Sequence, residues 1–203
     1  MNFQQGNLYH IYNQGINRQK IFFYRKNYLF FIEKIRRHVV PFADVIAWCL
    51  MPNHFHLMVE VKEITRPSMA GKSEFAGNII PVTKSMTFNS SIGVMLRSYT
   101  RAVNLQQNRT GSLFREETKA ICLNQIQDIS PTWFSVAGGT IINIDSPDLQ
   151  YPNTCYKYIH DNPVKAGMVN DATDWEFSSY GEIYGKNEPV LVEIKSVKKL
   201  KLF

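Results

Sequence analysis

Cysteines are few in this chain, and long apolar runs are missing. The three cysteines, Cys49, Cys122 and Cys155, lie far apart without any C-x-x-C pair, so we expect buried free thiols and no structural zinc site. No apolar stretch approaches the ~20 residues that a membrane-spanning helix needs. The polar start over residues 1–6 is unlike a signal peptide. These absences predict a cytoplasmic protein without a membrane segment.

The composition indicates one globular domain with an excess of positive charge. The chain has 203 residues, of which 44% are hydrophobic and 13% aromatic, as in proteins with a packed core. Its formal net charge of +6 favours a polyanionic partner, because each neutralised phosphate releases counterions. Part of this charge belongs to the basic end, 186–203, which we interpret as a C-terminal tail beyond a domain over 1–185. A solvated tail with no specific role is the simplest interpretation of that end.

Cationic residues recur in segments that also carry aromatic residues. This interleaving suits single-stranded nucleic acid, whose phosphates pair with cations while its bases stack on aromatic rings. Solvated helix faces over buried aromatic residues are an equally open alternative at this point. The residues concerned are Arg97, Arg101, Arg109, Arg115, Lys119, Lys157 and Lys165, with Tyr99, Phe114 and Tyr158 among them.

Apolar periodicity predicts alternating strands and helices. Strands are expected at 7–13, 44–51, 54–61 and 118–123, the middle two joined as a hairpin by Pro52 and Asn53. Helices are expected at 25–40, at 93–104 behind a cap at Ser90 or Ser91, and from Pro147 or Pro152 to Pro163. We expect Pro163 to end the last helix, since the residue before a proline disfavours helix.

This order of elements, β-α-β-β-α-β-α, predicts an α+β fold in which helices pack on an antiparallel sheet. Two stretches do not fit it. The range 62–92 is rich in Pro, Gly and Ser, and 124–150 carries a Gly-Gly break, with 141–144 as a candidate short strand. Both ranges are interpreted as possible insertions.

His54-Phe55-His56 places two imidazoles on one face of a predicted strand, because strand side chains alternate with period 2. Two neutral imidazoles at i and i+2 can share a divalent metal ion. The motif alone is common by chance, so it does not establish a metal site. Glu60 shares the face but lies four residues further, at ~3.3 Å per residue, and is not expected to be a ligand.

Four blocks of the chain, in this order, resemble the REP-associated tyrosine transposases, a group of the single-tyrosine HUH transposases. The blocks are YHIYNQGINRQ at 9–19, AWCLMPNHFHL at 47–57, GSLF at 111–114 and YIHDNPVKAGMV at 158–169. DWEFSSY at 174–180 follows them, while 62–92 and 124–150 match poorly. The resemblance implies a ferredoxin-like HUH nuclease architecture.

The resemblance also implies a reaction. A helix tyrosine, here Tyr158, would attack a phosphodiester of single-stranded or hairpin DNA, with Asn162 as a third metal ligand beside His54 and His56. Residues at i and i+4 do share a helix face. Mg²⁺ or Mn²⁺ would polarise the phosphate. Because a phenol has a pKa of about 10, it can both attack and leave, so the 5′-phosphotyrosine would allow strands to be rejoined without ATP.

DNA contacts are expected from Arg97, Arg101, Arg115, Lys119 and Lys165. Glu116 and Glu117 depart from the family pattern and would repel DNA, whereas Lys119 matches it.

Other interpretations stay open from the sequence. Tyr158 can be a buried helix tyrosine and Asn162 a helix cap, while Tyr156 and His160 are expected to face elsewhere. A catalytically silent DNA-binding protein that recognises repeat hairpins is the main alternative function. A replication-initiator nuclease is a third, against which the short length without a helicase domain argues. A homodimer, with the tyrosine acting in cis or in trans, is also left open.

Overall fold

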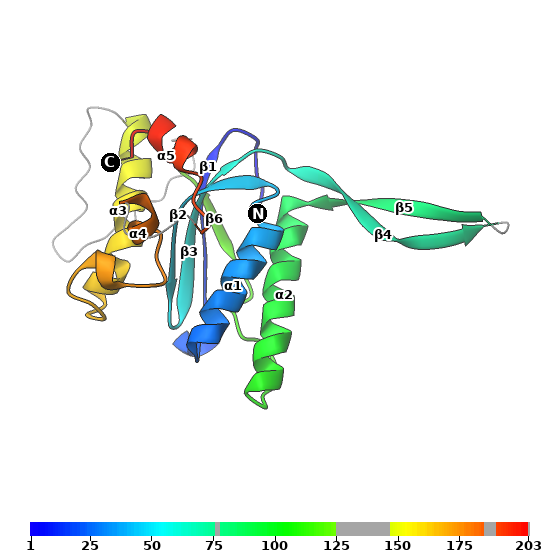
Figure 1. Ribbon diagram of the computed structural model, residues 1–203, viewed down its shortest axis with the longest axis horizontal. Coiled ribbons are helices and arrows are strands. Elements are labelled where there is room, and N and C mark those ends of the chain that lie inside the picture. Colours follow the sequence, from blue (N-terminus) through cyan, green and yellow to red (C-terminus); the bar gives the residue numbers. More distant parts are fainter. Residues whose placement is uncertain (76–77, 125–146, 185–189, 203) are drawn as a thin grey trace.

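A four-stranded antiparallel sheet in the order β2-β3-β1-β6 forms the centre of the molecule. The computed structural model describes residues 1–75, 78–124, 147–184 and 190–202 (Figure 1). The strands of the sheet are β1 (Leu8–Gln14), β2 (Ala43–Met51), β3 (His54–Val61) and β6 (Lys119–Cys122). The main helices are α1 (Arg25–His38), α2 (Phe88–Gln106) and α3 (Pro147–Lys165).

The two faces of the sheet carry different helices. In Figure 1, α1 and α2 lie on one side of the strands and α3 lies on the other. The strand order and the β-α-β-β-α-β connectivity make the fold ferredoxin-like, which confirms the predicted α+β class with an antiparallel sheet. The hairpin at Pro52 and Asn53 is confirmed as well, because β2 pairs with β3 from Met51↔His54 onward.

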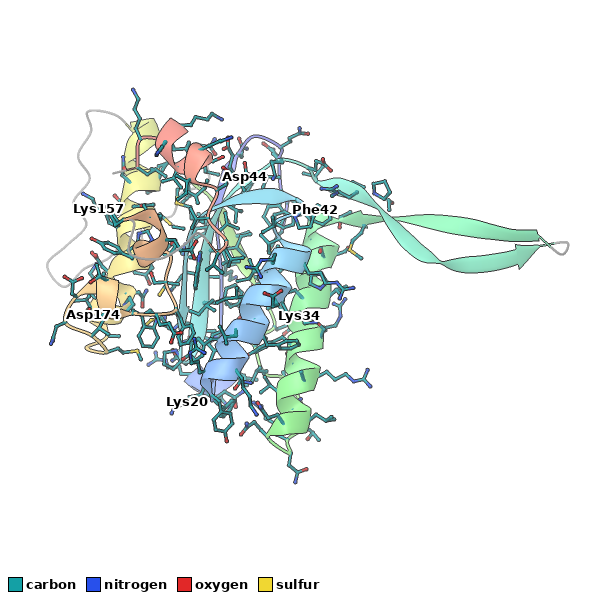
Figure 2. All side chains as sticks on the ribbon, viewed as in Figure 1. Lys20, Lys34, Phe42, Asp44, Lys157 and Asp174 are labelled. Carbon is teal, nitrogen blue, oxygen red and sulfur yellow. The ribbon has the colours of Figure 1, made fainter. Side chains whose placement is uncertain are left out.

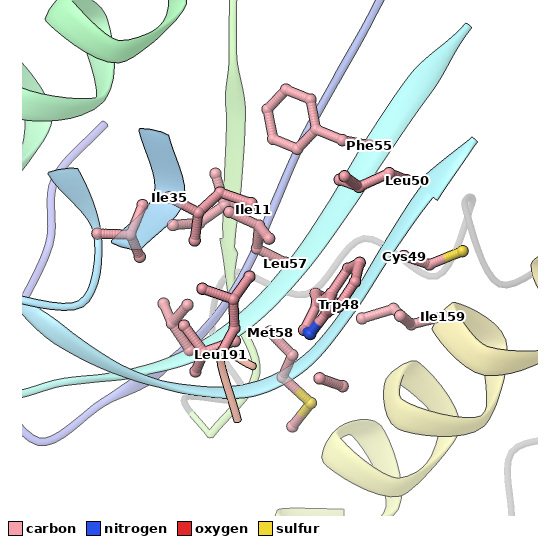
Figure 3. Packing of buried hydrophobic residues seen from close by; sticks show 14 of the residues in the cluster. Ile11, Ile35, Trp48, Cys49, Leu50, Phe55, Leu57, Met58, Ile159 and Leu191 are labelled. Atoms are coloured by element: carbon pink, nitrogen blue, oxygen red, sulfur yellow. The ribbon is translucent and has the colours of Figure 1, made fainter. Parts of the chain in front are cut away.

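Alternation along β3 explains this arrangement. Phe55 and Leu57 are fully buried on the α1 and α2 side, where the Phe55 ring lies 5.1 Å from that of Phe31. Each such side chain contributes about 1.5–3 kcal/mol when buried. On the opposite side Cys49 lies toward Ile159 of α3 (Figure 3). The histidines of β3 belong to this second face, so α3 has to pack over a partly polar surface.

Two helix ends differ from the predictions. Thr87 caps α2, because its side chain accepts a hydrogen bond from the Ser90 amide, so neither Ser90 nor Ser91 is the cap. Helix α3 does not end at Pro163 but continues to Lys165. The amide of Ala166 still donates to the Asn162 carbonyl at 3.0 Å, so helical hydrogen bonding resumes beyond the proline. Gly167, with φ +66°, follows the helix.

The expectation that 62–92 is irregular is wrong. This range holds the hairpin β4 (Thr65–Phe75) and β5 (Asn78–Thr87) and the first turn of α2. The hairpin projects away from the sheet as a two-stranded ribbon (Figure 1). Prolines are compatible with it because each strand of a ribbon has an unpaired edge. Of the second expected insertion, 125–146 lies outside the described residues, as does the candidate strand at 141–144; 147–150 begins α3.

The C-terminal segment is not a solvated tail. Leu191, Val192, Val197 and Leu202 are buried. The short helix α5 (Ile194–Lys199) lies in this segment, and the short helix α4 (Tyr180–Ile183) precedes it. Glu182 holds the segment in place. Its carboxylate accepts hydrogen bonds from the Trp48 indole at 3.0 Å and from the amides of 190–192 at 2.9–3.2 Å. The apolar residues of the basic end therefore pack into the core, even though the segment carries several positive charges.

The cysteines match expectation. All three cysteines are free and buried. Within the described ranges, no helix combines the length and apolar character that crossing a membrane requires. Among the described residues, short 3₁₀ turns also lie at Ile16–Arg18 and Ala172–Asp174.

His160 is a buried structural residue. It is 1% exposed, and its Nε2 lies 2.8 Å from the Ser179 hydroxyl, which in turn accepts a hydrogen bond from the Trp48 amide. The rings of Tyr156 and Tyr180 lie 4.5 and 5.4 Å away. Burial among these neutral groups lowers the pKa of His160 from 6.5 to about 3.

We predict that this histidine makes folding sensitive to acid. Below pH 6.5, the ordinary pKa of histidine, the unfolded chain binds a proton at this residue, whereas the folded chain does not bind it until the pH falls to about 3. Stability is therefore lost as the pH falls between these two values. Urea unfolding from pH 7 to 4 should show a shallower loss for His160→Gln than for the wild type, by up to about 1.4 kcal/mol per pH unit. Equal slopes for both proteins would contradict the assignment.

Candidate active site

The paired strands β1 and β3 and the helix α3 bring the site together. Cross-strand pairing places His56 opposite Tyr12 and His54 opposite Gln14, so these side chains share the face that α3 covers. On α3, Tyr158 and Asn162 stand one helical turn apart and turn toward the two histidines. The rings of Tyr158 and His56 meet edge to face, with centroids 5.3 Å apart.

The Asn162 amide lies between the two imidazoles. Its Oδ1 is 3.3 Å from His54 Nε2, and its Nδ2 is 3.3 Å from His56 Nε2. The two imidazole rings themselves are 4.9 Å apart and nearly perpendicular. Both Nε2 atoms and the amide therefore converge on one small region.

The hydrogen bonds around His54 leave a lone pair aimed at this region. Its Nδ1 lies 2.6 Å from Asn53 Oδ1, and a carbonyl oxygen only accepts, so Nδ1 carries the proton and Nε2 does not. Nε2 and Asn162 Oδ1 then face each other as two acceptors. A cation between them would satisfy both, and nitrogen and oxygen ligands of this kind suit a divalent metal ion.

Electrostatics keep the imidazoles neutral. Burial lowers the pKa of His54, and burial followed by repulsion from His10 and His54 lowers the pKa of His56 well below 6.5. Neutral imidazole is the form that binds metal. Among the described residues, no group of three His, Cys, Asp or Glu side chains could hold a metal ion. The Asn162 amide is the candidate for a third protein ligand, because it lies 3.3 Å from the Nε2 atoms of both histidines.

Tyr158 is half-buried at the edge of this cluster. Burial is the main cause that raises its pKa above 10, while the hydrogen bond with Asn162 lowers it. Lys165 Nζ lies 5.9 Å from the centre of the tyrosine ring and 3.5 Å from the Asp161 carboxylate. Lys165 thus lies beside the tyrosine, and its charge is shared with a neighbouring acid.

A cavity of about 420 Å³ opens onto these groups. Tyr158, His54, His56 and Asn162 line it together with Arg115 and Lys119, whose exposed ammonium group pairs with the Glu117 carboxylate. The remaining lining residues are Tyr12, Asn13, Gln14 and Glu117.

A second cavity of about 810 Å³ adjoins the first, because Asn13 and Arg115 line both. The predicted DNA contacts Arg97 and Arg101 of α2 line this second cavity and not the first. Asn13 fixes the segment between the two, since its amide donates to the Arg115 carbonyl at 3.1 Å and to the Thr118 hydroxyl at 2.9 Å.

Some residues of the sequence analysis lie elsewhere. Tyr156 is 3% exposed and faces His160, as expected of a residue on another side of α3. Lys157 projects from α3 away from the sheet (Figure 2). Glu60 pairs with Lys199 at 3.1 Å.

Two residues of the site were missed from the sequence. His10 is fully buried, and its Nε2 lies 2.9 Å from His56 Nδ1. The Tyr12 ring stacks on His10 at 4.8 Å. The signal that could have found them is the alternation of 7–13, which puts both on one face of β1. Only the pairing of β1 with β3 shows that this face of β1 lies on the same side of the sheet as His54 and His56.

Comparison with known proteins supports the fold. No family model and no curated relative matches the chain. One solved structure that is similar is a REP-associated tyrosine transposase bound to a REP hairpin, with 17% sequence identity and a TM-score of 0.53. The match covers 94% of this chain and 87% of that one. At this identity it shows a distant relationship of fold.

We predict that the converging nitrogen and oxygen atoms bind Mn²⁺. Titration followed by electron paramagnetic resonance should show one site in the wild type. In His54→Ala the affinity should fall at least tenfold, since even partners outside the ligand set cost about 10- to 100-fold. His38→Ala, at the end of α1, serves as the matched control and should bind like the wild type. Equal affinity in all three proteins would exclude this site.

Proposed function

We propose that the protein is a transposase-type endonuclease and strand transferase that cleaves and rejoins single-stranded DNA through Tyr158. The observation that carries this proposal is the position of Tyr158, edge-on to His56 and one turn from Asn162, at a cavity lined with cations. The solved structure of similar fold was bound to a REP hairpin, which supports hairpin DNA with single-stranded flanks as the substrate class. A DNA substrate also agrees with the expected cytoplasmic location.

The proposed reaction exchanges one phosphodiester for another. The Tyr158 oxygen attacks the scissile phosphorus, the O–P bond of a 5′-phosphotyrosine forms, and the bond from phosphorus to the 3′ oxygen breaks. The phenol loses one proton and the departing 3′ oxygen takes one up, so the step balances without a further reactant. Attack by a free 3′-OH reverses these events and rejoins two strands.

The residues around Tyr158 orient the reacting groups. His54, His56 and Asn162 would hold a divalent ion, which when bound neutralises charge on the phosphate oxygens. Tyr158 is half-buried against His56, so its ring has few alternative positions from which to meet the phosphate. Arg115 and Lys119 lie along the same cavity and would pair with the flanking phosphates.

The adjoining cavity supplies a path for the strand. A strand passing Arg115 would enter the groove that Arg97, Arg101 and Arg109 line. Arg97 and Arg101 are exposed and have no resolved carboxylate partner among the described residues, so they are available to phosphates. Backbone contacts of this kind position DNA without reading its sequence.

Replacement of the nucleophile should separate chemistry from binding. Wild-type protein with Mn²⁺ should form a covalent adduct on hairpin DNA with single-stranded flanks, seen as a band that survives denaturing electrophoresis. Tyr158→Phe removes only the attacking oxygen, so it should form no adduct yet bind the same DNA with similar affinity. Tyr156→Phe is the matched control and should form adducts like the wild type.

The same assay tests the alternative function. If the wild-type protein binds hairpin DNA but forms no adduct with Mg²⁺ or Mn²⁺, the protein is a DNA-binding protein that recognises repeat hairpins. If Tyr158→Phe still forms the adduct, another residue is the nucleophile and the proposed mechanism is wrong.

The arginine groove predicts a salt dependence. Each phosphate contact on a single strand contributes about −0.7 to the slope of log K against log salt concentration. Arg97→Ala and Arg101→Ala should therefore each make the slope shallower by about that amount for a single-stranded oligonucleotide. Arg37→Ala, on the outer side of α1, should leave the slope unchanged. If all three variants have the slope of the wild type, the strand does not follow this groove.

A further inference from the structure

We infer that His10 is a positioning residue, whose Nε2 accepts a hydrogen bond from the Nδ1–H of His56 and so turns the Nε2 lone pair of His56 toward Asn162 and the cavity. The consequence for metal binding rests on the proposed function. The tautomer of His56 does not, because it exists whether or not the protein cleaves DNA. The two can therefore fail separately.

The contact between the two histidines is close and buried. His10 Nε2 lies 2.9 Å from His56 Nδ1, and the side chains are 0% and 5% exposed. The rings are stacked with centroids 5.0 Å apart and planes 23° from parallel. They reach each other because His10 and His56 come from adjacent, antiparallel strands and project from the same face.

The direction of this hydrogen bond follows from the other end of His56. Asn162 Nδ2 lies 3.3 Å from His56 Nε2, and an amide nitrogen only donates, so Nε2 is the accepting atom. A neutral imidazole has one proton, which then sits on Nδ1. That proton points at His10 Nε2, which therefore accepts the hydrogen bond.

The alternative direction disables the site. If His10 donated to His56 Nδ1, the His56 proton would move to Nε2 and face the Asn162 amide nitrogen, donor against donor. A protonated Nε2 also has no lone pair for a metal ion. Tyr12 opposes rotation of the His10 ring, since the two are stacked at 4.8 Å with planes 26° apart. His10 and Asn53 therefore have the same role, because each accepts a hydrogen bond from the Nδ1–H of one histidine.

The tautomer can be read directly by nuclear magnetic resonance. In protein labelled with ¹⁵N-histidine, long-range ¹H–¹⁵N spectra distinguish the protonated ring nitrogen from the unprotonated one. We expect His56 to carry its proton on Nδ1 in the metal-free protein and to keep it there with Mg²⁺. A proton on Nε2, or a mixture of the two tautomers, would overturn the inference, whatever the protein does to DNA.

Two variants test the consequence. His10→Phe keeps a flat ring but cannot accept, so the His56 proton should redistribute and Mn²⁺ affinity should fall about 10- to 100-fold. His10→Gln restores an accepting oxygen and should recover most of the affinity. His160→Gln, which replaces a buried histidine on another side of α3, should bind Mn²⁺ like the wild type.

The outcomes separate a positioning role from a structural one. Loss of affinity in His10→Phe with recovery in His10→Gln supports the inference, and wild-type affinity in both overturns it. Should His10→Phe fail to fold, the spectrum of the wild type and the His10→Gln affinity still decide. Adduct formation is not needed for any of these measurements, so absence of cleavage would count against the proposed function alone.

Discussion

The packing of α3 across the histidine face of the sheet is the contact on which the site depends. One face of β3 is wholly apolar and lies against α1 and α2, whereas the other presents His54 and His56. Asn162 of α3 lies between the two imidazoles, where its Nδ2 donates to His56 and its Oδ1 faces the lone pair of His54. The same helix turn that brings Asn162 to the histidines also places Tyr158 beside them. Fold stability and the proposed chemistry therefore share one interface.

Neutral imidazoles in fixed orientations are the second element of this account. Asn53 and His10 lie at the Nδ1 atoms of His54 and His56, so the Nε2 atoms are directed inward. This arrangement requires a further buried histidine, His10 on β1. Burial lowers the pKa of His10 to about 3. The stacked ring of Tyr12 covers it. A histidine pair alone would not define such a site, because each ring could hold its proton on either nitrogen.

Local sequence patterns predicted much of the fold. What they could not predict depends on contacts between segments that lie far apart in the sequence. The alternation at 54–61 and the turn at Pro52 determine the β2–β3 hairpin, because both act over a few residues. The ribbon at 65–87 was missed because its prolines and glycines read as loop, although a two-stranded ribbon tolerates them. The C-terminal segment was missed because Glu182, which binds it, lies outside the basic run. His10 belongs to the site only through the strand register, which no local pattern reveals.

The central claim is that Tyr158 is the nucleophile oriented by the histidine face. Peptide mapping of the protein–DNA adduct tests it most directly. Cleavage after Lys157 and Lys165 yields a peptide of residues 158–165 in which Tyr158 is the only tyrosine. Mass spectrometry should find the 5′-phosphorylated nucleotide on that peptide. A nucleotide on the peptide that contains Tyr12, or on any other residue, would contradict the account.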